Sequence, residues 1–240
     1  EEKDQIIRIY NPSSDIIYPG YSTYGCEDLS GSWNPWMLSD PDSEDLFNLF
    51  LGAPNLQFKF VLDVLRYFYY DNKYLDFREN IIPDVETRLA QITIDDELNA
   101  INPDLSEFKT NGGKIVMWHG WCDPMIQPKS SIIYYDAVEG VDPDLRDFFR
   151  LFMEPGVLHI SGGPGPGSYG PKDIKNEDGV DWLNVLENWV ESGVAPERVV
   201  AKLEQAGYER PLCPYPQLAI YDMVGFGWLA SSFECQNPGP

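Results

Sequence analysis

Two apolar runs, each ending on or next to one of the chain's only two histidines, constrain the fold most strongly. They read KIVMWH at 114–119 and LFMEPGVLHI at 151–160. Short apolar runs of this kind are typical of buried strands. The segment between them, QPKSSIIYYDAVEG, is entered through Pro128 and closed by Gly140, which predicts a helix. Strands that alternate with helices favour a three-layer α/β unit with a mostly parallel sheet.

Further helices are predicted on both sides of this unit. Asp104 is a suitable cap for a short helix that Asn-Gly-Gly at 111–113 ends. Two more helices are predicted at 142–150 and 179–193. The first hundred residues are irregular, apart from one helix with apolar residues at helical spacing within 53–72. We therefore divide the chain near residue 105, into segments 1–105 and 106–240.

The charge of the chain limits its partners. The 240 residues are 43% hydrophobic and carry a formal net charge of −22, with a sequence pI near 4.2. Such a surface repels phosphate backbones and anionic lipid, which argues against nucleic-acid and membrane partners. No apolar run approaches the roughly 20 residues of a membrane span. The start, EEKDQIIRIY, is no signal peptide, although a mature secreted chain would begin in the same way.

The four cysteines are Cys26, Cys122, Cys213 and Cys235. They show no CxxC spacing, which argues against a zinc site, and they allow three pairings within the chain. Cys213 and Cys235 flank a short C-terminal segment rich in proline, glycine and aromatic residues, where a disulfide would hold down a tail that otherwise frays. Buried free thiols are the alternative.

Two polar residues occupy the positions that catalytic side chains take in a parallel sheet. Asp123 follows the first predicted strand and His159 ends the second, and loops beyond the carboxyl ends of such strands hold catalytic groups. In an α/β-hydrolase the triad runs Ser…Asp…His along the chain, and these two would be its last members. Asp123 could instead be a turn residue before Pro124, and His119 could be the base in place of His159.

A serine nucleophile is missing from this pattern. A nucleophile elbow reads G-x-S-x-G on a strand-to-helix turn, and the chain contains no such motif. GYSTYG spaces its glycines differently, and GPGSYG places Ser168 after the histidine. Read from its residues alone, the chain therefore contains half of an active site.

Three ordered blocks resemble the tannase and feruloyl esterase family. They are NPDLSEFKTNGGKIVMWHGWCDPMIQPKSSIIYYDAV, RLFMEPGVLHISGGPGPG and the ending RPLCPYPQLAIYD…FEC. The resemblance implies the C-terminal part of an α/β-hydrolase fold, at 106–240, and part of an inserted lid domain, at 1–105. It matches Asp123 and His159 to the family's catalytic acid and base. It also matches Cys213 and Cys235 to the cysteines of the family's C-terminal blocks, which supports their pairing.

The resemblance further implies a partner that supplies the serine. Fungal tannases are cut into two disulfide-linked subunits, and the chain looks like the C-terminal one. Many members have a cysteine directly after the catalytic histidine, bridged to one before the serine, whereas Ile160 stands there in this chain. Cys26 and Cys122 are then the candidates for an interchain or cross-lid disulfide.

The activity that the resemblance implies is hydrolysis of phenolic-acid esters by a secreted enzyme. We expect galloyl esters of tannins as substrates, with feruloyl esters as the alternative, and Trp118 and Trp121 as substrate-binding residues that stack on the phenolic ring. No cofactor is expected for catalysis, no metal ligands are identified in this chain, and any structural calcium would lie in lid residues outside it. The alternative from another class is a non-catalytic scaffold that binds polyphenols or glycans.

Overall fold

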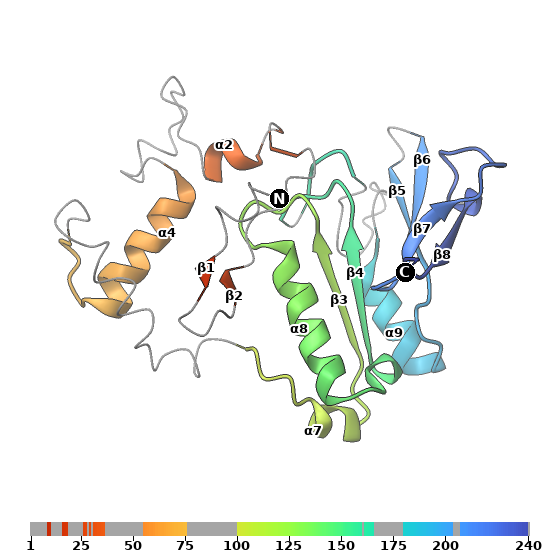
Figure 1. The fold of residues 1–240 in the computed structure, drawn as a ribbon, viewed down its shortest axis with the longest axis horizontal. Helices are drawn as coiled ribbons and strands as arrows, with labels where there is room; N and C mark the ends of the chain where they lie inside the picture. The colour runs from red at the N-terminus through yellow and green to blue at the C-terminus, as the bar shows by residue number, and fades with distance from the viewer. Residues whose placement is uncertain are drawn as a thin grey trace.

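The centre of the molecule is a pair of parallel strands, β3 (Ile115–Gly120) and β4 (Phe149–Glu154), linked by helix α8 (Pro128–Val141) (Figure 1). Their register pairs Ile115 with Phe149 and Gly120 with Glu154, so both strands end at the same edge. The computed structural model describes residues 9–10, 16–18, 26–27, 29, 31–36, 55–75, 100–159, 161–165, 180–203 and 207–239.

Side chains of the two strands alternate between two core layers. Met117 and Leu151 belong to the cluster that packs under α8, whereas Trp118 and Phe152 belong to the cluster that packs under α9 (Trp182–Ser192). Helices therefore cover both faces of the strand pair (Figure 1). This arrangement confirms the predicted three-layer α/β fold.

The helices predicted around Pro128 and Asp181 both form, and capping residues mark their ends. Pro128 opens α8, as predicted, but the helix continues through Gly140 to Val141. Asp181 caps α9 by accepting a hydrogen bond from the Asn184 N–H at 3.0 Å, and Gly193 ends it with a φ of 72°. A left-handed residue of this kind commonly closes a helix, and glycine adopts it without steric cost.

The two shorter predicted helices also form. Helix α7 (Ser106–Thr110) begins where Asp104 accepts a hydrogen bond from the Ser106 N–H at 3.0 Å. Helix α4 (Leu56–Val64) continues into a π-helical turn, η1 (Leu65–Tyr69).

The helix predicted at 142–150 is wrong. Only a 3₁₀ turn, η2 (Leu145–Asp147), forms there, and β4 begins at Phe149. Phe148 and Phe149 are 1% and 0% exposed, and the apolar run from Phe148 onward is buried as a strand with core on both faces. Continuous burial of this kind belongs to a parallel strand.

The central pair, β3 with β4, is parallel, as predicted for the α/β unit. The other pairs are antiparallel: β1 (Ile9–Tyr10) with β2 (Ile16–Tyr18), β5 (Val199–Leu203) with β6 (Tyr208–Leu212), and β7 (Leu218–Tyr221) with β8 (Phe233–Gln236).

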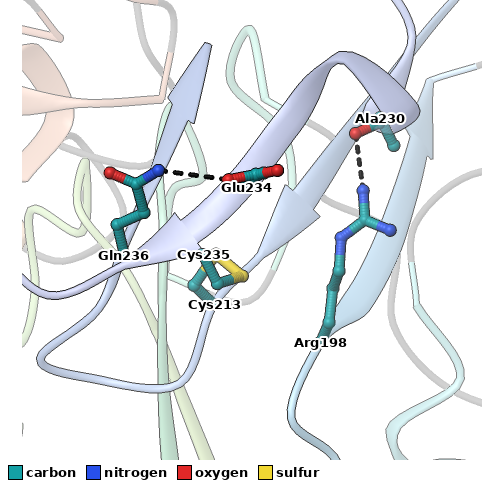
Figure 2. The surroundings of a disulfide bond; sticks show 6 residues. All are labelled: Arg198, Cys213, Ala230, Glu234, Cys235 and Gln236. Carbon is teal, nitrogen blue, oxygen red and sulfur yellow. Dashed lines mark hydrogen bonds between the residues drawn. A yellow bond between two sulfur atoms is a disulfide. The ribbon is translucent and has the colours of Figure 1, made fainter. Parts of the chain in front are cut away.

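The C-terminal hairpins are fastened to the central strands. A disulfide joins Cys213, which follows β6, to Cys235 on β8 (Figure 2). Directly after Cys213, the N–H of Tyr215 donates to the carbonyl of Leu151 on β4 at 2.7 Å. Arg198 donates to the carbonyl of Ala230 at 2.5 Å, at the start of the 3₁₀ turn η4 (Ala230–Ser232) (Figure 2).

Only part of the segment 1–105 is described. Within it, Trp36 of helix α2 (Trp33–Trp36) stacks on Phe60 of α4, with ring centroids 6.2 Å apart (Figure 1 shows both helices). Ile160 and Ser168 lie outside the described residues. Within the described ranges, every helix is too short or too polar to cross a membrane.

Candidate active site

Two loops follow the carboxyl ends of β3 and β4 and lie side by side. The N–H of Trp121 donates to the carbonyl of Glu154, and the N–H of Cys122 donates to the carbonyl of Val157, both at 2.9 Å. These hydrogen bonds extend the pairing of the strands beyond their ends. They bring the loop that contains Asp123 against the loop that contains His159.

Gly120 makes this close approach possible. A Cβ atom at this position would lie 2.3 Å from the carbonyl oxygen of Val157 and 2.5 Å from that of Leu158. Any other residue would push the two loops apart. The sequence prediction did not assign a role to Gly120, although a glycine directly after an apolar strand is a signal of close backbone approach.

The glycine-rich segment after β4 folds back on itself and supports His159. Gly156 has a φ of 75°, and its carbonyl accepts a hydrogen bond from the N–H of Gly165 at 2.8 Å. The N–H of Leu158 donates to the carbonyl of Gly162 at 3.2 Å. These two hydrogen bonds join the residues before His159 to the glycines that follow it, so the loop is tight around the histidine.

The Asp123 carboxylate receives four hydrogen bonds. Its Oδ1 accepts from the backbone N–H groups of Met125 at 2.7 Å and Ile126 at 3.0 Å. Its Oδ2 lies 3.0 Å from His119 Nε2 and 2.8 Å from His159 Nδ1. The aspartate side chain is 1% exposed. An ionised carboxylate has about four lone-pair sites, so this group is fully hydrogen-bonded.

These contacts set the ionisation of the acid. Burial raises the pKa of the Asp123 carboxyl, and hydrogen bonds from His119, His159 and the N–H groups of Ile126 and Met125 lower it by more. The pKa therefore lies below its ordinary value, and Asp123 is a carboxylate at neutral pH. Asp123 also makes a turn before Pro124, so the turn and the interaction with histidine are one arrangement rather than alternatives.

The two histidines differ in what their second ring nitrogen does. His119 Nδ1 lies 2.7 Å from the Ser131 hydroxyl, so both of its nitrogens face protein groups, and its side chain is 9% exposed. The His159 side chain is 36% exposed, and no described residue forms a hydrogen bond with its Nε2. His159 is thus the imidazole that can exchange a proton with a substrate or a nucleophile.

A second disulfide lies beside this pair. It joins Cys26 to Cys122, the residue before Asp123, with Cα atoms 5.5 Å apart. Both cysteines are buried in a small cluster with Leu158, the residue before His159. The two candidates for an interchain or cross-lid disulfide, Cys26 and Cys122, are therefore bonded to each other. Since Cys213 and Cys235 also form a disulfide, all four cysteines are paired within the chain.

The two tryptophans predicted to bind substrate lie in different surroundings. Trp118 stacks on Trp182 with ring centroids 6.5 Å apart, on the α9 face of β3, which gives it a packing role in the core. Trp121 lines a pocket of about 310 Å³ together with Met153, Tyr215 and Leu218. Small-molecule sites begin at about 300 Å³, so the pocket can hold one aromatic ring. Among the described residues there is no group of acidic, histidine or cysteine side chains that could hold a metal ion.

The layered core and the two loops at its edge have an α/β-hydrolase-type fold. The family model "Tannase and feruloyl esterase" matches residues 11–236, and the chain belongs to that family. Family members are esterases, that is, carboxylic-ester hydrolases.

This chain matches only part of the length of several curated relatives. An uncharacterized esterase of Xanthomonas campestris is 29% identical, over 94% of this chain and 43% of the relative. The mono(2-hydroxyethyl) terephthalate hydrolase of Piscinibacter sakaiensis is 36% identical, over 58% of this chain and 22% of the relative. The probable feruloyl esterase B of Aspergillus clavatus is 30% identical, over 78% and 37%. The chain thus spans less than half the length of these relatives.

Solved structures show the same fold. Feruloyl esterase B from Aspergillus oryzae superposes with a TM-score of 0.69 at 24% identity, over 96% of this chain and 44% of that one. Tannin acyl hydrolase from Aspergillus niger superposes with a TM-score of 0.56 at 22% identity, over 78% of this chain and 34% of that one.

Proposed function

We propose that the chain supplies the acid and the base of a Ser-His-Asp triad in a secreted serine esterase that cleaves phenolic-acid esters. The observation that supports this most directly is the 2.8 Å contact between the buried Asp123 carboxylate and Nδ1 of the partly exposed His159. A buried carboxylate in this position holds the imidazole in one tautomer and stabilises the imidazolium.

In the proposed reaction His159 Nε2 takes the proton of a serine hydroxyl as the serine attacks the ester carbonyl. The same nitrogen then protonates the leaving alcohol, and water hydrolyses the acyl-enzyme with His159 as base again. Asp123 stays ionised throughout and balances the charge on the imidazolium. This chemistry requires no cofactor.

The serine must come from outside these 240 residues, and we propose an N-terminal subunit of the same precursor as its source. Two features support this. The chain covers only 43% of its Xanthomonas relative. In addition, β3 pairs on one edge only among the described residues, whereas parallel sheets are normally larger and covered. Because no cysteine is left unpaired, the two parts would associate without a disulfide between them.

The proposed substrates are esters of aromatic acids. The names of the curated relatives specify a terephthalate monoester and feruloyl esters, which share an aromatic acyl group. Galloyl esters of tannins remain our first expectation from the sequence blocks. Feruloyl esters are the second candidate, favoured by the 30% identity to feruloyl esterase B over 78% of the chain. A binding scaffold without catalysis would not need the buried, fully hydrogen-bonded acid beside an exposed imidazole.

Secretion is supported by two disulfides and by similarity to fungal feruloyl esterases. Disulfides persist in oxidising compartments such as the extracellular space.

The test is hydrolysis of methyl gallate and methyl ferulate by the enzyme assembled with its serine-bearing part. Asp123→Asn and His159→Ala should each lower kcat by on the order of 10⁴. Asp144→Asn, which changes an exposed acid far from the loops, is the control and should keep wild-type turnover. Wild-type turnover in Asp123→Asn would refute the triad, and the ratio of the two substrates decides between galloyl and feruloyl preference.

A further inference from the structure

We propose that His119 is a positioning residue for the Asp123–His159 pair, and that Ser131 supports it by a hydrogen bond to its other ring nitrogen. The inference rests on the proposed function and deepens it, because it extends the triad by two residues that never touch substrate. The four side chains form one chain of hydrogen bonds, in the order Ser131, His119, Asp123, His159.

The contacts of His119 determine which of its nitrogens carries hydrogen. Nε2 faces two acceptors, Asp123 Oδ2 at 3.0 Å and the Ile126 carbonyl at 3.2 Å, so Nε2 is the protonated nitrogen. In the neutral ring Nδ1 is then an acceptor, and the Ser131 hydroxyl donates to it across 2.7 Å. The two acceptors at Nε2 disfavour the other tautomer, in which Nε2 would turn a lone pair toward the carboxylate, and the Ser131 hydroxyl satisfies the nitrogen that this leaves.

The consequence for Asp123 is a carboxylate that cannot rotate freely. Backbone N–H groups hold Oδ1, and the N–H groups of two imidazoles share Oδ2. Without the His119 N–H, Oδ2 keeps a single donor and the carboxylate can turn away from His159. Because Asp123 orients the base, a loss of this kind affects turnover rather than substrate affinity.

The position of the two residues in the fold suits this role. His119 is on β3 with only 8% exposure, and Ser131 is in the first turns of α8, which packs on the same strand. The rigid layers of the core thus hold the acid from behind, while His159 approaches it from the exposed side. Sites built on strands and helices are held more closely than sites on loops alone.

The first test reads the tautomers directly by NMR of protein labelled with ¹⁵N-histidine. Signals are assigned by their loss in His119→Gln and His159→Gln. We expect the Nε2–H form for His119 and the Nδ1–H form for His159. Ser131→Ala should shift the His119 nitrogen signals, whereas Ser130→Ala should not, because the Ser130 hydroxyl donates to the Gln127 carbonyl in the same helix turn. An Nδ1–H tautomer at His119 would overturn the inference.

The second test compares two variants in the assembled enzyme, with kcat normalised to serine sites titrated by an organophosphonate. His119→Phe fills the space without a donor, and His119→Gln keeps an amide N–H near the place of Nε2–H. We expect His119→Phe to lower kcat about 10- to 100-fold with KM nearly unchanged, the size found for outer partners of metal-bound histidines. His119→Gln should recover most of the loss.

Two outcomes separate this inference from the proposed function. An active Asp123→Asn enzyme, measured alongside, overturns the proposed function. An inactive Asp123→Asn beside a fully active His119→Phe overturns the positioning role alone. Equal losses in His119→Phe and His119→Gln would also overturn it, since a purely structural imidazole is not replaced by one amide donor.

Discussion

At the scale of single residues, Asp123 governs the site because four N–H groups converge on its two oxygens. Two come from the turn that Pro124 imposes, and two come from imidazoles on different loops. The N–H groups of the turn orient the carboxylate, and the two imidazoles form hydrogen bonds with its other oxygen. A change at this one side chain therefore affects both the local backbone and the proposed base.

The lowered pKa of Asp123 predicts a specific pH dependence of stability. Because the folded-state pKa lies below the unfolded value of about 3.9, ionised Asp123 contributes stability that is fully present above that value. This contribution is lost as the pH falls through the folded-state pKa. The difference in unfolding free energy between wild type and Asp123→Asn should therefore shrink below about pH 4. Urea unfolding at pH 7, 5, 4 and 3 measures it, and a constant difference would contradict the prediction.

Gly120 gives a second prediction at this scale, with a matched control in the same chain. Gly120→Ala places a Cβ within 2.5 Å of two carbonyl oxygens, so it should destabilise the protein by about 1–3 kcal/mol or more and separate the two loops. Gly140→Ala meets no atom within 4 Å and lies in α8, so it should stabilise by about 0.5–1 kcal/mol. Denaturant unfolding compares the two. Equal effects would show that close approach at Gly120 is not required.

At the scale of elements, the two disulfides constrain different parts of the fold. Cys26–Cys122 spans 96 residues and ties the segment that contains α2 to the Asp123 loop. Cys213–Cys235 spans 22 residues and ties the C-terminal hairpins together. Loop-closure entropy gives about 4.7 and about 3.4 kcal/mol for these separations.

Replacing each disulfide by a pair of serines should therefore have unequal effects. Cys26→Ser/Cys122→Ser should cost about 1 kcal/mol more stability than Cys213→Ser/Cys235→Ser. It should also lower kcat more, because Cys122 and Leu158 adjoin the two proposed triad residues. Urea unfolding and ester hydrolysis by both variants measure this. A larger loss of kcat from the C-terminal pair would show that the Cys26–Cys122 bond does not support the loops.

The elements that sequence predicts are those with local signals. Helix α9 has a capping aspartate and a closing glycine, and β3 is an uninterrupted apolar run. The helix predicted at 142–150 fails because its charged first half looks like a helix surface, while burial of Phe148 and Phe149 in the core decides the outcome. Local pattern cannot show that tertiary burial.

The candidate site also has features that the sequence predicts and features that only tertiary contacts determine. Strand order places Asp123 and His159 at one edge of the sheet, and their chain positions suffice to predict that. The pairing of Cys26 with Cys122 joins residues 96 positions apart, and three connectivities fit the sequence equally. The His119–Asp123 contact was missed because a histidine at a strand end more often completes its hydrogen bonds with backbone. Only the turn at 123–126 brings the carboxylate under it.

At the scale of the whole molecule, large apolar side chains are exposed on two separate parts of the described chain. Phe60, Tyr67 and Phe68 of the α4–η1 helix are 54–60% exposed, and Val224 and Phe226 at the C-terminal hairpin are 90% and 61% exposed. The helix and the hairpin each gather exposed apolar side chains, and apolar surface gathered in this way suits a contact region. Together with the single-sided pairing of β3, these residues support the proposal that the rest of the hydrolase domain covers this chain in the working enzyme.

The manner of that association gives the last prediction. Since the four cysteines pair within the chain, reduction should not release any second polypeptide from it. Denatured protein should show the same polypeptide masses with and without reductant, and alkylation should label its four cysteines only after reduction. If a partner subunit is present, denaturant alone should free the 27.3 kDa chain from it. A larger mass that splits only on reduction would mean that Cys26 or Cys122 bonds to the partner. The Asp123 loop would then be tied to the serine-bearing part directly, and the stability difference between the two serine-pair variants would lose its basis.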